Sequence, residues 1–426
     1  MNILLLCLVV IIGVIVLGQK TKINIGLWAL AAAYIFGTFV LKISPSDLIN
    51  AWPTKIFVLL FSVTFFYSFA VTNGTLEKMA LVAVYSSRKI PWAIPIVLYI
   101  LGFVISGIGA GDAATVMLIP IAMSIAKITG MNYFLAAIAT LSGVSPGGFS
   151  PISTIGVFIR GLMEDVGGYS PELADAFGTR AMFQAILLFF VVFAIAYIVF
   201  KGYKIQVPDL VKPEPFDNKQ RVTLMIIACF VLVLVLPSLL DALVPGVPFI
   251  MLMKKNINVA FIAFIGSIAA LLLKVGDEKK AFARVPWHVL TLLSGMGMLI
   301  SVATKSGAVE LLSNYVSNNV SFVMVPIMLS IFAGILSLFV SGFIVNMTFF
   351  SLVPGLALAL GYDPGLLFAT IAVGGLATSV SPFSSSGGLV IASVEDEEKS
   401  NMMFKYLLTM PFINITIYII LIQLGI

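Results

Sequence analysis

Two short polar phrases inside very apolar surroundings hold the residues best suited to chemistry. They read Ser150-Pro151-Ile152-Ser153-Thr154-Ile155-Gly156 and Ser381-Pro382-Phe383-Ser384-Ser385-Ser386-Gly387. Serine, threonine, glycine and proline interrupt a helix. At bilayer depth, broken backbone survives only where protein or a water-filled cavity supplies hydrogen-bond partners. Two such breaks in matching places indicate a transport site.

The composition explains why these phrases stand out. Of 426 residues, 60% are hydrophobic and 10% charged, with a mean hydropathy of +1.13. Too few polar groups remain to cover a water-facing surface. Runs of about 20 apolar residues span a bilayer, so we predict a polytopic membrane protein whose first run is a retained span and no signal peptide. Ten runs qualify: 2–17, 24–42, 54–72, 133–163 (broken), 179–201, 222–240, 256–274, 286–303, 364–393 (broken) and 404–425.

The cysteines, the histidine and the net charge offer little further chemistry. Cys7 and Cys229 both lie in apolar runs, which excludes a disulfide framework and a thiolate metal site. His288 stands beside Trp287 at the mouth of a span, where an interfacial pair is expected. We assign the net charge of +5 to cytoplasmic loops and expect no nucleic-acid partner.

The sequence contains an internal repeat of two copies. Four landmarks recur in the same order. Pro53 and Pro286 each lead a span that is followed by a glycine turn, Ser106-Gly107 corresponds to Ser341-Gly342, Pro120 to Pro354, and the Ser-Pro phrases close each copy. Each copy crosses the membrane an odd number of times, which inverts the second. We therefore expect an all-α polytopic membrane protein, an inverted repeat of about ten transmembrane helices.

Each copy also contains an apolar segment interrupted near its middle, 92–126 and 322–360. The interruptions, at residues 107–112 and 341–346, are polar or glycine-rich, whereas the middle of a straight span would be apolar. Re-entrant loops are tolerated when buried in protein. We predict two re-entrant helical hairpins.

Basic residues test the topology, because cytoplasmic loops carry an excess of lysine and arginine. The predicted topology places 17 of the 24 on one side and leaves seven on the other, namely Lys42, Lys55, Arg160, Arg180, Lys254, Lys255 and Lys305. The first side is then cytoplasmic and both termini face outward. Arg160 is expected to be an outer-face topological charge, although it lies just beyond the first phrase and could attract an anion.

Asp112, Asn346 and Thr348 lie at the predicted hairpin tips. An intramembrane carboxylate is costly and indicates function, so Asp112 is expected to bind a cation or couple protons; the alternative is a helix cap. Asn346 and Thr348 offer an amide and a hydroxyl to a substrate carboxylate, although Asn346 also suits a cap.

The remaining candidates surround the two breaks. As substrate contacts we expect Ser150, Ser153, Thr154, Ser381, Ser384 and Ser385. About half of these hydroxyls could instead bond the backbone of their own turns. As cation ligands we expect Gly111, Ser145, Gly147 and Ser386, besides Asp112. No other metal site and no cofactor is predicted.

At these residues the chain resembles the ion transporter superfamily, specifically the divalent anion/sodium symporters and, more closely, the malonate and dicarboxylate carrier-like proteins. Phe149 to Val157 is similar to the carrier group's own signature, and the Pro-Trp-led span contains Ser294-Gly295-Met296-Gly297. The resemblance covers nearly the whole chain. It implies a homodimer in the cytoplasmic (inner) membrane, a scaffold, and a transport domain that moves as an elevator. A di- or tricarboxylate, here expected to be a C3–C4 dicarboxylate, would bind between the hairpin tips with sodium ions.

The sequence repeat divides the chain, and the resemblance implies which helices form the scaffold. The first repeat covers 1–201, with scaffold helices 1–74, interfacial helix 75–89, hairpin 92–126, broken helix 133–163 and helix 179–201. A cytoplasmic linker, 202–221, follows. The second repeat covers 222–426, with scaffold helices 222–303, interfacial helix 307–320, hairpin 322–360, broken helix 364–393 and helix 404–425.

The tips depart from the Ser-Asn-Thr pattern of the better-known symporters, because they read Gly111-Asp112-Ala113 and Val345-Asn346-Met347-Thr348. A carboxylate near an anion site needs a neutralising cation, so we predict coupling to sodium, or to protons.

Other functions fit less well. Gly109 to Asp112 spells the motif of intramembrane aspartyl proteases, but such chemistry needs two carboxylates that share a proton, and the other aspartate among the first 160 residues, Asp47, is in an outer loop. No enzyme is therefore expected. An anion channel, and a sodium/proton or oxyanion exchanger of the same superfamily, remain as alternatives.

Overall fold

The computed structural model describes residues 3–111, 113–205, 212–244, 247–307, 320–338, 342–394 and 396–425. Every regular element in these ranges is helical, so the all-α prediction is confirmed. The chain forms two compact units. Unit 1 comprises Met1–Phe57, Phe158–Leu188 and Pro286–Ile426, and unit 2 comprises Val58–Val157 and Phe189–Val285. Each unit draws segments from both predicted repeats.

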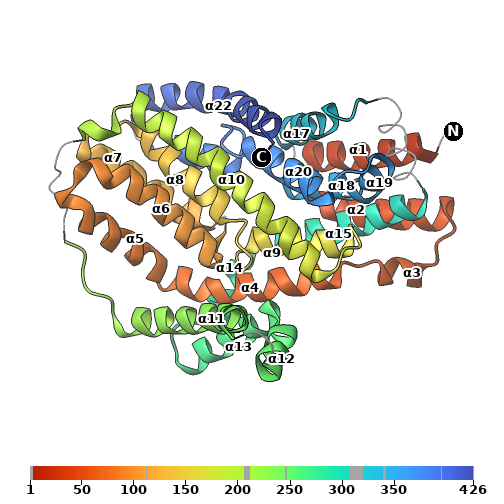
Figure 1. Cartoon of the computed structure of the whole chain (residues 1–426), viewed down its shortest axis with the longest axis horizontal. Helices are drawn as coiled ribbons and strands as arrows, with labels where there is room; N and C mark the ends of the chain where they lie inside the picture. The colour runs from red at the N-terminus through yellow and green to blue at the C-terminus, as the bar shows by residue number, and fades with distance from the viewer. Residues whose placement is uncertain are drawn as a thin grey trace. The chain divides into compact units, whose positions relative to one another are not determined.

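Unit 2 contains the first hairpin and the first half of the first broken span. Helices α6, α7 and α8 pack together, as Figure 1 shows. Its helices are most of α4 (Thr54–Thr72), α5 (Thr75–Ser86), α6 (Ile94–Ile105), α7 (Ala113–Thr129), α8 (Tyr133–Gly147), the end of α10 (Pro171–Val199), α11 (Asn218–Leu243), α12 (Pro248–Asn256), α13 (Val259–Leu272) and α14 (Glu278–Arg284). Short 3₁₀ helices occupy Ser87–Lys89, Pro91–Ala93 and Gly202–Lys204, and a π-helix occupies Ser106–Ala110.

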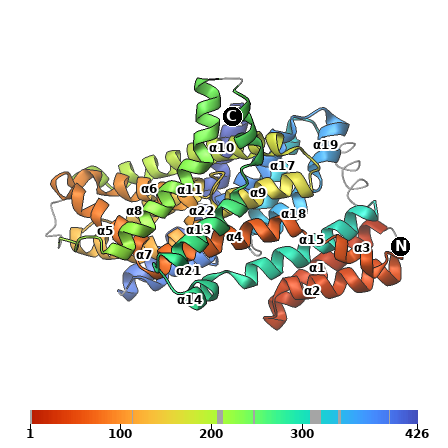
Figure 2. The same cartoon turned by 90° about the horizontal axis from the view of Figure 1, so that it is seen from below.

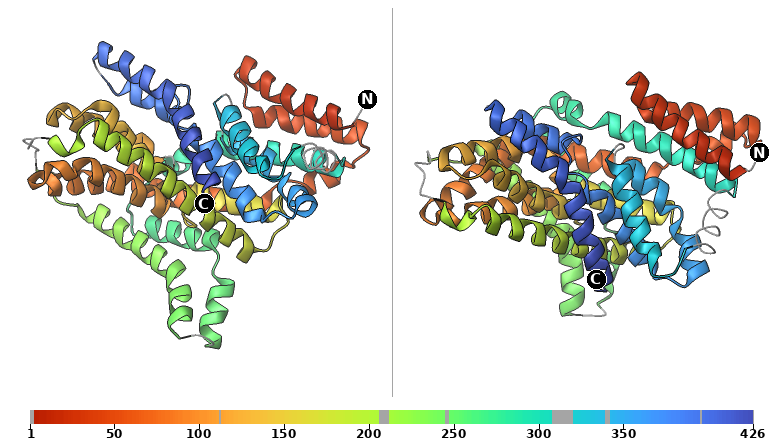
Figure 3. Two further views of the ribbon diagram at one scale, coloured as in Figure 1. Left: turned by 45° about the horizontal axis from the view of Figure 1, so that its top comes forward. Right: turned by 90° about the horizontal axis from the view of Figure 1, so that it is seen from above.

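Unit 1 contains the second hairpin and the whole second broken span. Its helices are α1 (Ile3–Thr21), α2 (Ile25–Tyr34) with a π-helical end (Ile35–Val40), α3 (Pro45–Asn50), most of α9 (Thr154–Asp165), the start of α10, α15 (Trp287–Lys305), α17 (Met324–Ser337), α18 (Gly342–Phe350), α19 (Val353–Leu360), α20 (Pro364–Ala377), α21 (Ser385–Ala392) and α22 (Glu397–Gln423). Helices α1 and α2 lie side by side (Figure 3). Helix α2 also packs along α15 (Figure 2), where glycines allow the backbones to touch: a Cβ at Gly26 would collide with the Thr291 carbonyl.

Among the described residues, five helices are long and apolar enough to cross a membrane, or six if the bent pair α18–α19 forms one span. They are Thr54–Thr72, Pro91–Ala110, Pro171–Val199, Trp287–Lys305 and Glu397–Gln423. The broken spans predicted at 133–163 and 364–393 are present as the pairs α8–α9 and α20–α21, whose halves are each shorter than a bilayer-spanning helix. The chain is a multi-pass membrane protein.

The same helix packing occurs in both units, at equivalent places of the two repeats. In unit 2 a Cβ on Gly143 of α8 would collide with the Tyr99 carbonyl of α6. In unit 1 a Cβ on Gly374 of α20 would meet the Ser330 carbonyl of α17 at 2.7 Å. Tyr99 and Ser330, like Gly143 and Gly374, stand 231 positions apart, as do the Ser-Pro phrases. In each repeat, the first helix of the hairpin segment therefore packs closely against the broken span at a glycine.

The two predicted interfacial segments have different outcomes. Residues 75–89 form α5 followed by a 3₁₀ turn, as expected for a short helix at that place. Of the second segment, 307–320, all but the ends lies outside the described residues.

Candidate functional site

The first break is a compact turn between α8 and α9. The Ser150 amide donates to the Gly147 carbonyl at 3.0 Å, the Ser153 amide to the Ser150 carbonyl at 3.0 Å, and the Gly156 amide to the Gly148 carbonyl at 2.7 Å. A Cβ at Gly156 would overlap the Ser150 carbonyl oxygen. The predicted helix break is therefore present, and its backbone is held by short local bonds.

The tip of the first hairpin lies directly on this break, within unit 2. A Cβ on Gly111 would strike Thr154 Oγ1 and lie 3.6 Å from Ser153 Oγ. Gly111 and Gly109 have φ of 51° and 129°, a region that side chains disfavour. A Cβ on Gly109 would also enter the ring of Tyr67. The tip thus needs glycine both for its backbone and for its close approach.

Three buried hydroxyls near the tip have no hydrogen-bond partner in the described structure: Tyr67 Oη, Ser106 Oγ and Ser153 Oγ. Their residues are at most 3% exposed. Buried polar groups are normally paired, so these oxygens are candidate contacts for an ion or a substrate. Ser145 is also buried, and a Cβ on Gly147 would collide with the Phe103 carbonyl, so the end of α8 has no room for a side chain there.

The donor set consists of oxygens, which suits a hard cation such as sodium better than a thiophilic or imidazole-binding metal. Within the described residues no group of three or more His, Cys, Asp or Glu could hold a metal ion. Asp112, the carboxylate expected at this tip, lies outside the described residues.

The second break repeats the first turn inside unit 1. The Ser381 amide donates to the Thr378 carbonyl at 3.0 Å and the Ser384 amide to the Ser381 carbonyl at 3.0 Å. A Cβ at Gly387 would overlap the Ser381 carbonyl, as at Gly156. The sequence repeat is therefore also a repeat of backbone geometry.

The hydroxyls of the second break, in contrast, have partners in their own turn. Ser384 Oγ caps α21 by accepting from the Gly387 amide at 3.0 Å and donates to the Ser379 and Ser381 carbonyls at 2.6 Å each. Ser381 Oγ accepts from the Phe383 amide at 3.3 Å. Ser385 is exposed and Ser386 half-buried.

The sequence predicts Asn346 at a tip formed by residues 341–346, but residues 342–346 are helical, so Asn346 lies inside α18; residue 341 is outside the described ranges. Asn346 is 7% exposed, and its Oδ1 has no partner in the described structure. This oxygen lies 3.9 Å from the place of a Cβ on Gly375 of α20. Thr348 Oγ1 donates back to the Ile344 carbonyl at 2.8 Å. An amide oxygen is therefore available beside the second broken span, while Thr348 is engaged by its own helix.

Arg160 is buried and paired with an aspartate, whereas a topological charge would be solvent-facing; its side of the membrane stays a prediction. It is 7% exposed, and its Nε donates to Asp175 Oδ1 at 2.8 Å. Nη2 donates to Thr179 Oγ1 at 3.4 Å, and Gly178 leaves room for the guanidinium. All four residues belong to unit 1. The partner aspartate stands 15 positions downstream on α10, so only the packing of α9 on α10 reveals the pair.

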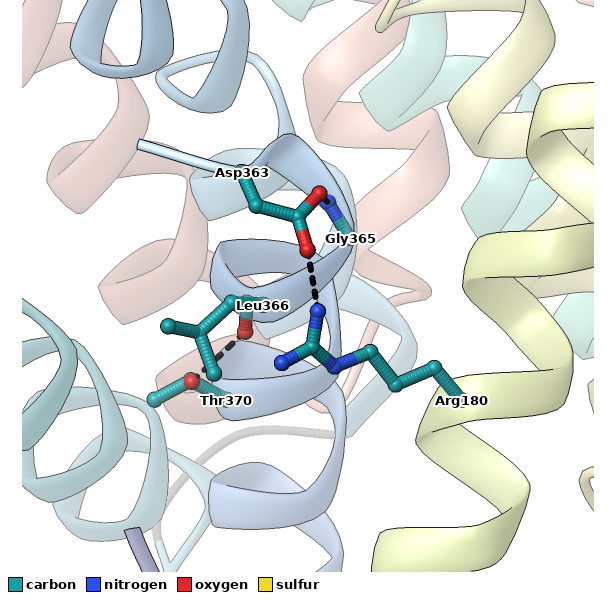
Figure 4. Close-up of polar contacts among 5 residues, drawn as sticks. All are labelled: Arg180, Asp363, Gly365, Leu366 and Thr370. Carbon is teal, nitrogen blue, oxygen red and sulfur yellow. Dashed lines mark hydrogen bonds and ion pairs between the residues drawn. The ribbon is translucent and has the colours of Figure 1, made fainter. Parts of the chain in front are cut away.

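Helix α20 is tied to its neighbours along its length by polar residues that the sequence analysis did not single out. At its start, Asp363 is the N-cap: its side chain accepts a hydrogen bond from the Gly365 amide and also pairs with Arg180 of α10 (Figure 4). In its middle, Tyr418 Oη bonds Gln184 at 2.6 Å and the Ala369 carbonyl at 3.2 Å.

At the end of α20, Asn414 donates to the Ala377 carbonyl at 2.8 Å, which the helix break has left without an intrahelical partner. Gln184, Asn414 and Tyr418 are all buried. The sequence does contain a signal for Gln184 and Asn414, because each is an amide inside an apolar span, and such residues pair with other groups in the membrane interior.

The comparisons with known proteins agree with this geometry. Residues 1–148 match the family model of the dicarboxylate carrier protein MatC N-terminus. The resemblance to malonate and dicarboxylate carrier-like proteins is thereby confirmed over those residues. Among solved structures, the chain is similar to the YdaH transporter of Alcanivorax borkumensis, whose crystal structure is described as having an unusual topology. The TM-score is 0.62 at 17% identity, over 92% of this chain and 89% of that one, so the two share a fold. No curated protein matches the chain.

Proposed function

We propose that this chain is a secondary active transporter of a small carboxylate anion, with a C3–C4 dicarboxylate as cargo. The observation that carries the proposal is the pair of helix breaks with the same turn, each joined within its unit to a hairpin. Broken helices of this kind hold substrates and coupling ions in inverted-repeat transporters. The match of residues 1–148 to a dicarboxylate carrier family supports the cargo class. We propose no enzymatic activity.

Cation coupling is the second part of the proposal. Ser106, Ser153 and backbone carbonyls of the first break, such as that of Ser145, would hold the ion, and sodium fits these oxygens. Asp112 would supply the charge, or would carry a proton in its place. The substrate would contact Asn346, whose amide has an unused oxygen, together with groups of the two breaks.

An elevator motion is the third part, supported by two matching joints. Gly74 and Gly307 each end the third span of a repeat with a positive φ, 72° and 78°. The residue before each contacts the first helix of the other predicted repeat, within the same compact unit. Asn73 donates to Thr223 Oγ1 of α11 at 2.7 Å, and Ser306 Oγ lies 3.2 Å from Cys7 Sγ of α1. A fixed anchor followed by a glycine suits a hinge between a scaffold and a moving arm. We propose a homodimer in the cytoplasmic membrane with both termini outside.

The test is uptake of labelled mono-, di- and tricarboxylates by proteoliposomes, with sodium and pH gradients imposed separately. We expect saturable dicarboxylate uptake that a sodium gradient drives, or a proton gradient in its place. Currents far above carrier turnover would instead show a channel. Uptake that ignores both gradients, with Asp112→Asn fully active, would contradict the coupling.

A further inference from the structure

The end of one membrane span and the start of another meet at one corner of unit 2. The span Pro91–Ala110 begins where the span Pro171–Val199 ends. Tyr197 Oη donates to the Trp92 carbonyl at 3.0 Å, and a Cβ at Gly202 would collide with the Tyr197 ring. The 3₁₀ helices Pro91–Ala93 and Gly202–Lys204 are in contact. Because both spans terminate here, the corner lies at the depth of lipid headgroups.

This corner carries four positive charges: Arg88, Lys89, Lys201 and Lys204. The flanking segments 78–111 and 189–205 contain no aspartate or glutamate. None of the ion pairs found among the described residues involves these four side chains. No carboxylate of the described residues therefore forms an ion pair with this corner.

One of the charges is held in place, while the others are accessible. The Arg88 guanidinium lies 4.0 Å from the centre of the Tyr85 ring, and its Nη1 donates to the Tyr85 carbonyl at 3.1 Å. Lys89, Lys201 and Lys204 are exposed. A fixed guanidinium with mobile ammonium groups around it suits a phosphate, which accepts hydrogen bonds from several donors.

Exposed apolar and aromatic side chains border the charges. Trp92 is 51% exposed, Tyr203 52% and Ile90 48%. Tryptophan and tyrosine favour the boundary between headgroups and acyl chains. The corner thus pairs groups that recognise a phosphate with groups that recognise the lipid attached to it.

We propose that this basic corner, consisting of Arg88, Lys89, Trp92, Lys201, Tyr203 and Lys204, binds the headgroup of an anionic phospholipid. Each lysine or arginine near a membrane surface contributes about 1 kcal/mol toward anionic lipid. Lysines and arginines that only set the orientation of the chain in the membrane need not cluster at one place, and none of them needs a fixed guanidinium. The lipid site would exist whether or not the chain transports a carboxylate.

The experiment measures which lipids the full-length protein retains. The protein is reconstituted in nanodiscs of equal parts phosphatidylglycerol and phosphatidylcholine, transferred to detergent, and its bound lipids are quantified by mass spectrometry. The test variant is Lys89→Gln/Lys204→Gln. The control is Lys279→Gln/Lys280→Gln, which removes the same charge from exposed positions of α14 in the same unit.

We expect the natural chain and the control to retain phosphatidylglycerol preferentially, and the test variant to lose that preference by about tenfold or more. Arg88→Gln should act in the same direction with an unchanged melting temperature. Equal losses in both double variants would show general charge attraction and overturn the proposal. Displacement of the lipid by inorganic phosphate alone at equal concentration would also overturn it, because the site would then recognise a soluble anion.

Discussion

Ser153 and Ser384 occupy equivalent places in the two breaks, yet their hydroxyls have different surroundings. Ser384 caps α21 and donates to two carbonyls, while Ser153 Oγ is buried without a partner in the described structure. One hydroxyl is used by the fold, and the other makes no such bond among the described residues. The asymmetry supports the proposal that, of these two equivalent serines, Ser153 contacts a ligand.

Alanine substitution at these two serines should therefore have opposite consequences. Ser384→Ala should lower the free energy of unfolding by about 1 kcal/mol, as expected for a lost N-cap. Ser153→Ala should leave stability unchanged but raise the sodium concentration for half-maximal uptake about tenfold, equivalent to about 1.4 kcal/mol. Thermal unfolding and sodium-dependent uptake measure the two effects. A stability loss in both variants, with sodium dependence unaltered, would count against a cation at Ser153.

The Arg160–Asp175 pair allows a second prediction for single residues. The Arg160 side chain is 9% exposed and that of Asp175 is 61% exposed. Asp175→Ala removes the carboxylate that pairs with the buried guanidinium and should destabilise the protein by about 1–2 kcal/mol, between the values for exposed and buried ion pairs. Arg160→Met removes the buried charge and leaves Asp175 in water, so it should cost less. The double variant should recover part of the loss in thermal unfolding; a loss equal to the sum of the single ones would show that the pair is not coupled.

At the scale of elements, the sequence predicted most helices and both breaks to within a few residues. Expected spans 54–72 and 286–303 coincide with the helices Thr54–Thr72 and Trp287–Lys305, and the segment 92–126 contains α6 and α7. The re-entrant course of that segment stays a prediction. Apolar runs and helix breakers act locally, which is why they can be read directly. The cross-links to α20 could not be predicted, because Gln184 and Tyr418 become partners only when α10 and α22 pack together.

The joint at Asn73-Gly74 gives a prediction at this scale. Gly74→Ala adds a Cβ to a left-handed residue and should cost about 1 kcal/mol in stability. If α5 moves as an arm, the same change should slow transport several-fold with little effect on the concentration for half-maximal uptake. Gly130→Ala is the matched control, since Gly130 also has a positive φ of 66° in open space but lies in the turn between α7 and α8. Equal slowing in both variants would contradict the hinge.

At the scale of the whole molecule, the compact units cut across the repeats. The chain passes from unit 2 to unit 1 between Val157 and Phe158, inside α9. The division into repeats at 202–221 stays a prediction. The repeats describe which parts of the sequence correspond to each other, while the units describe which segments pack together.

The predicted topology can be checked by labelling. Cys7 and Cys229 are first replaced by serine or alanine, and single cysteines are introduced as Pro215→Cys in the linker and Gly425→Cys near the C-terminus. We expect an impermeant maleimide to label Gly425→Cys on intact cells and Pro215→Cys only after permeabilisation, because basic residues favour the cytoplasm. The reverse pattern would invert the topology, and labelling of both from one side would refute it.

The sequence by itself determined the membrane class, the helical elements, the repeat and the positions of the two breaks, because hydropathy and helix-breaking residues act over neighbouring positions. Tertiary structure decided which polar groups form hydrogen bonds or ion pairs within the protein. Arg160 became a buried partner of Asp175 and Ser384 a helix cap, while Ser106, Ser153 and Asn346 kept oxygens without partners in the described structure. The cap at Ser384 is made by neighbours in its own turn. The partner of Arg160, in contrast, lies on another helix, and packing alone brings such groups within hydrogen-bond distance.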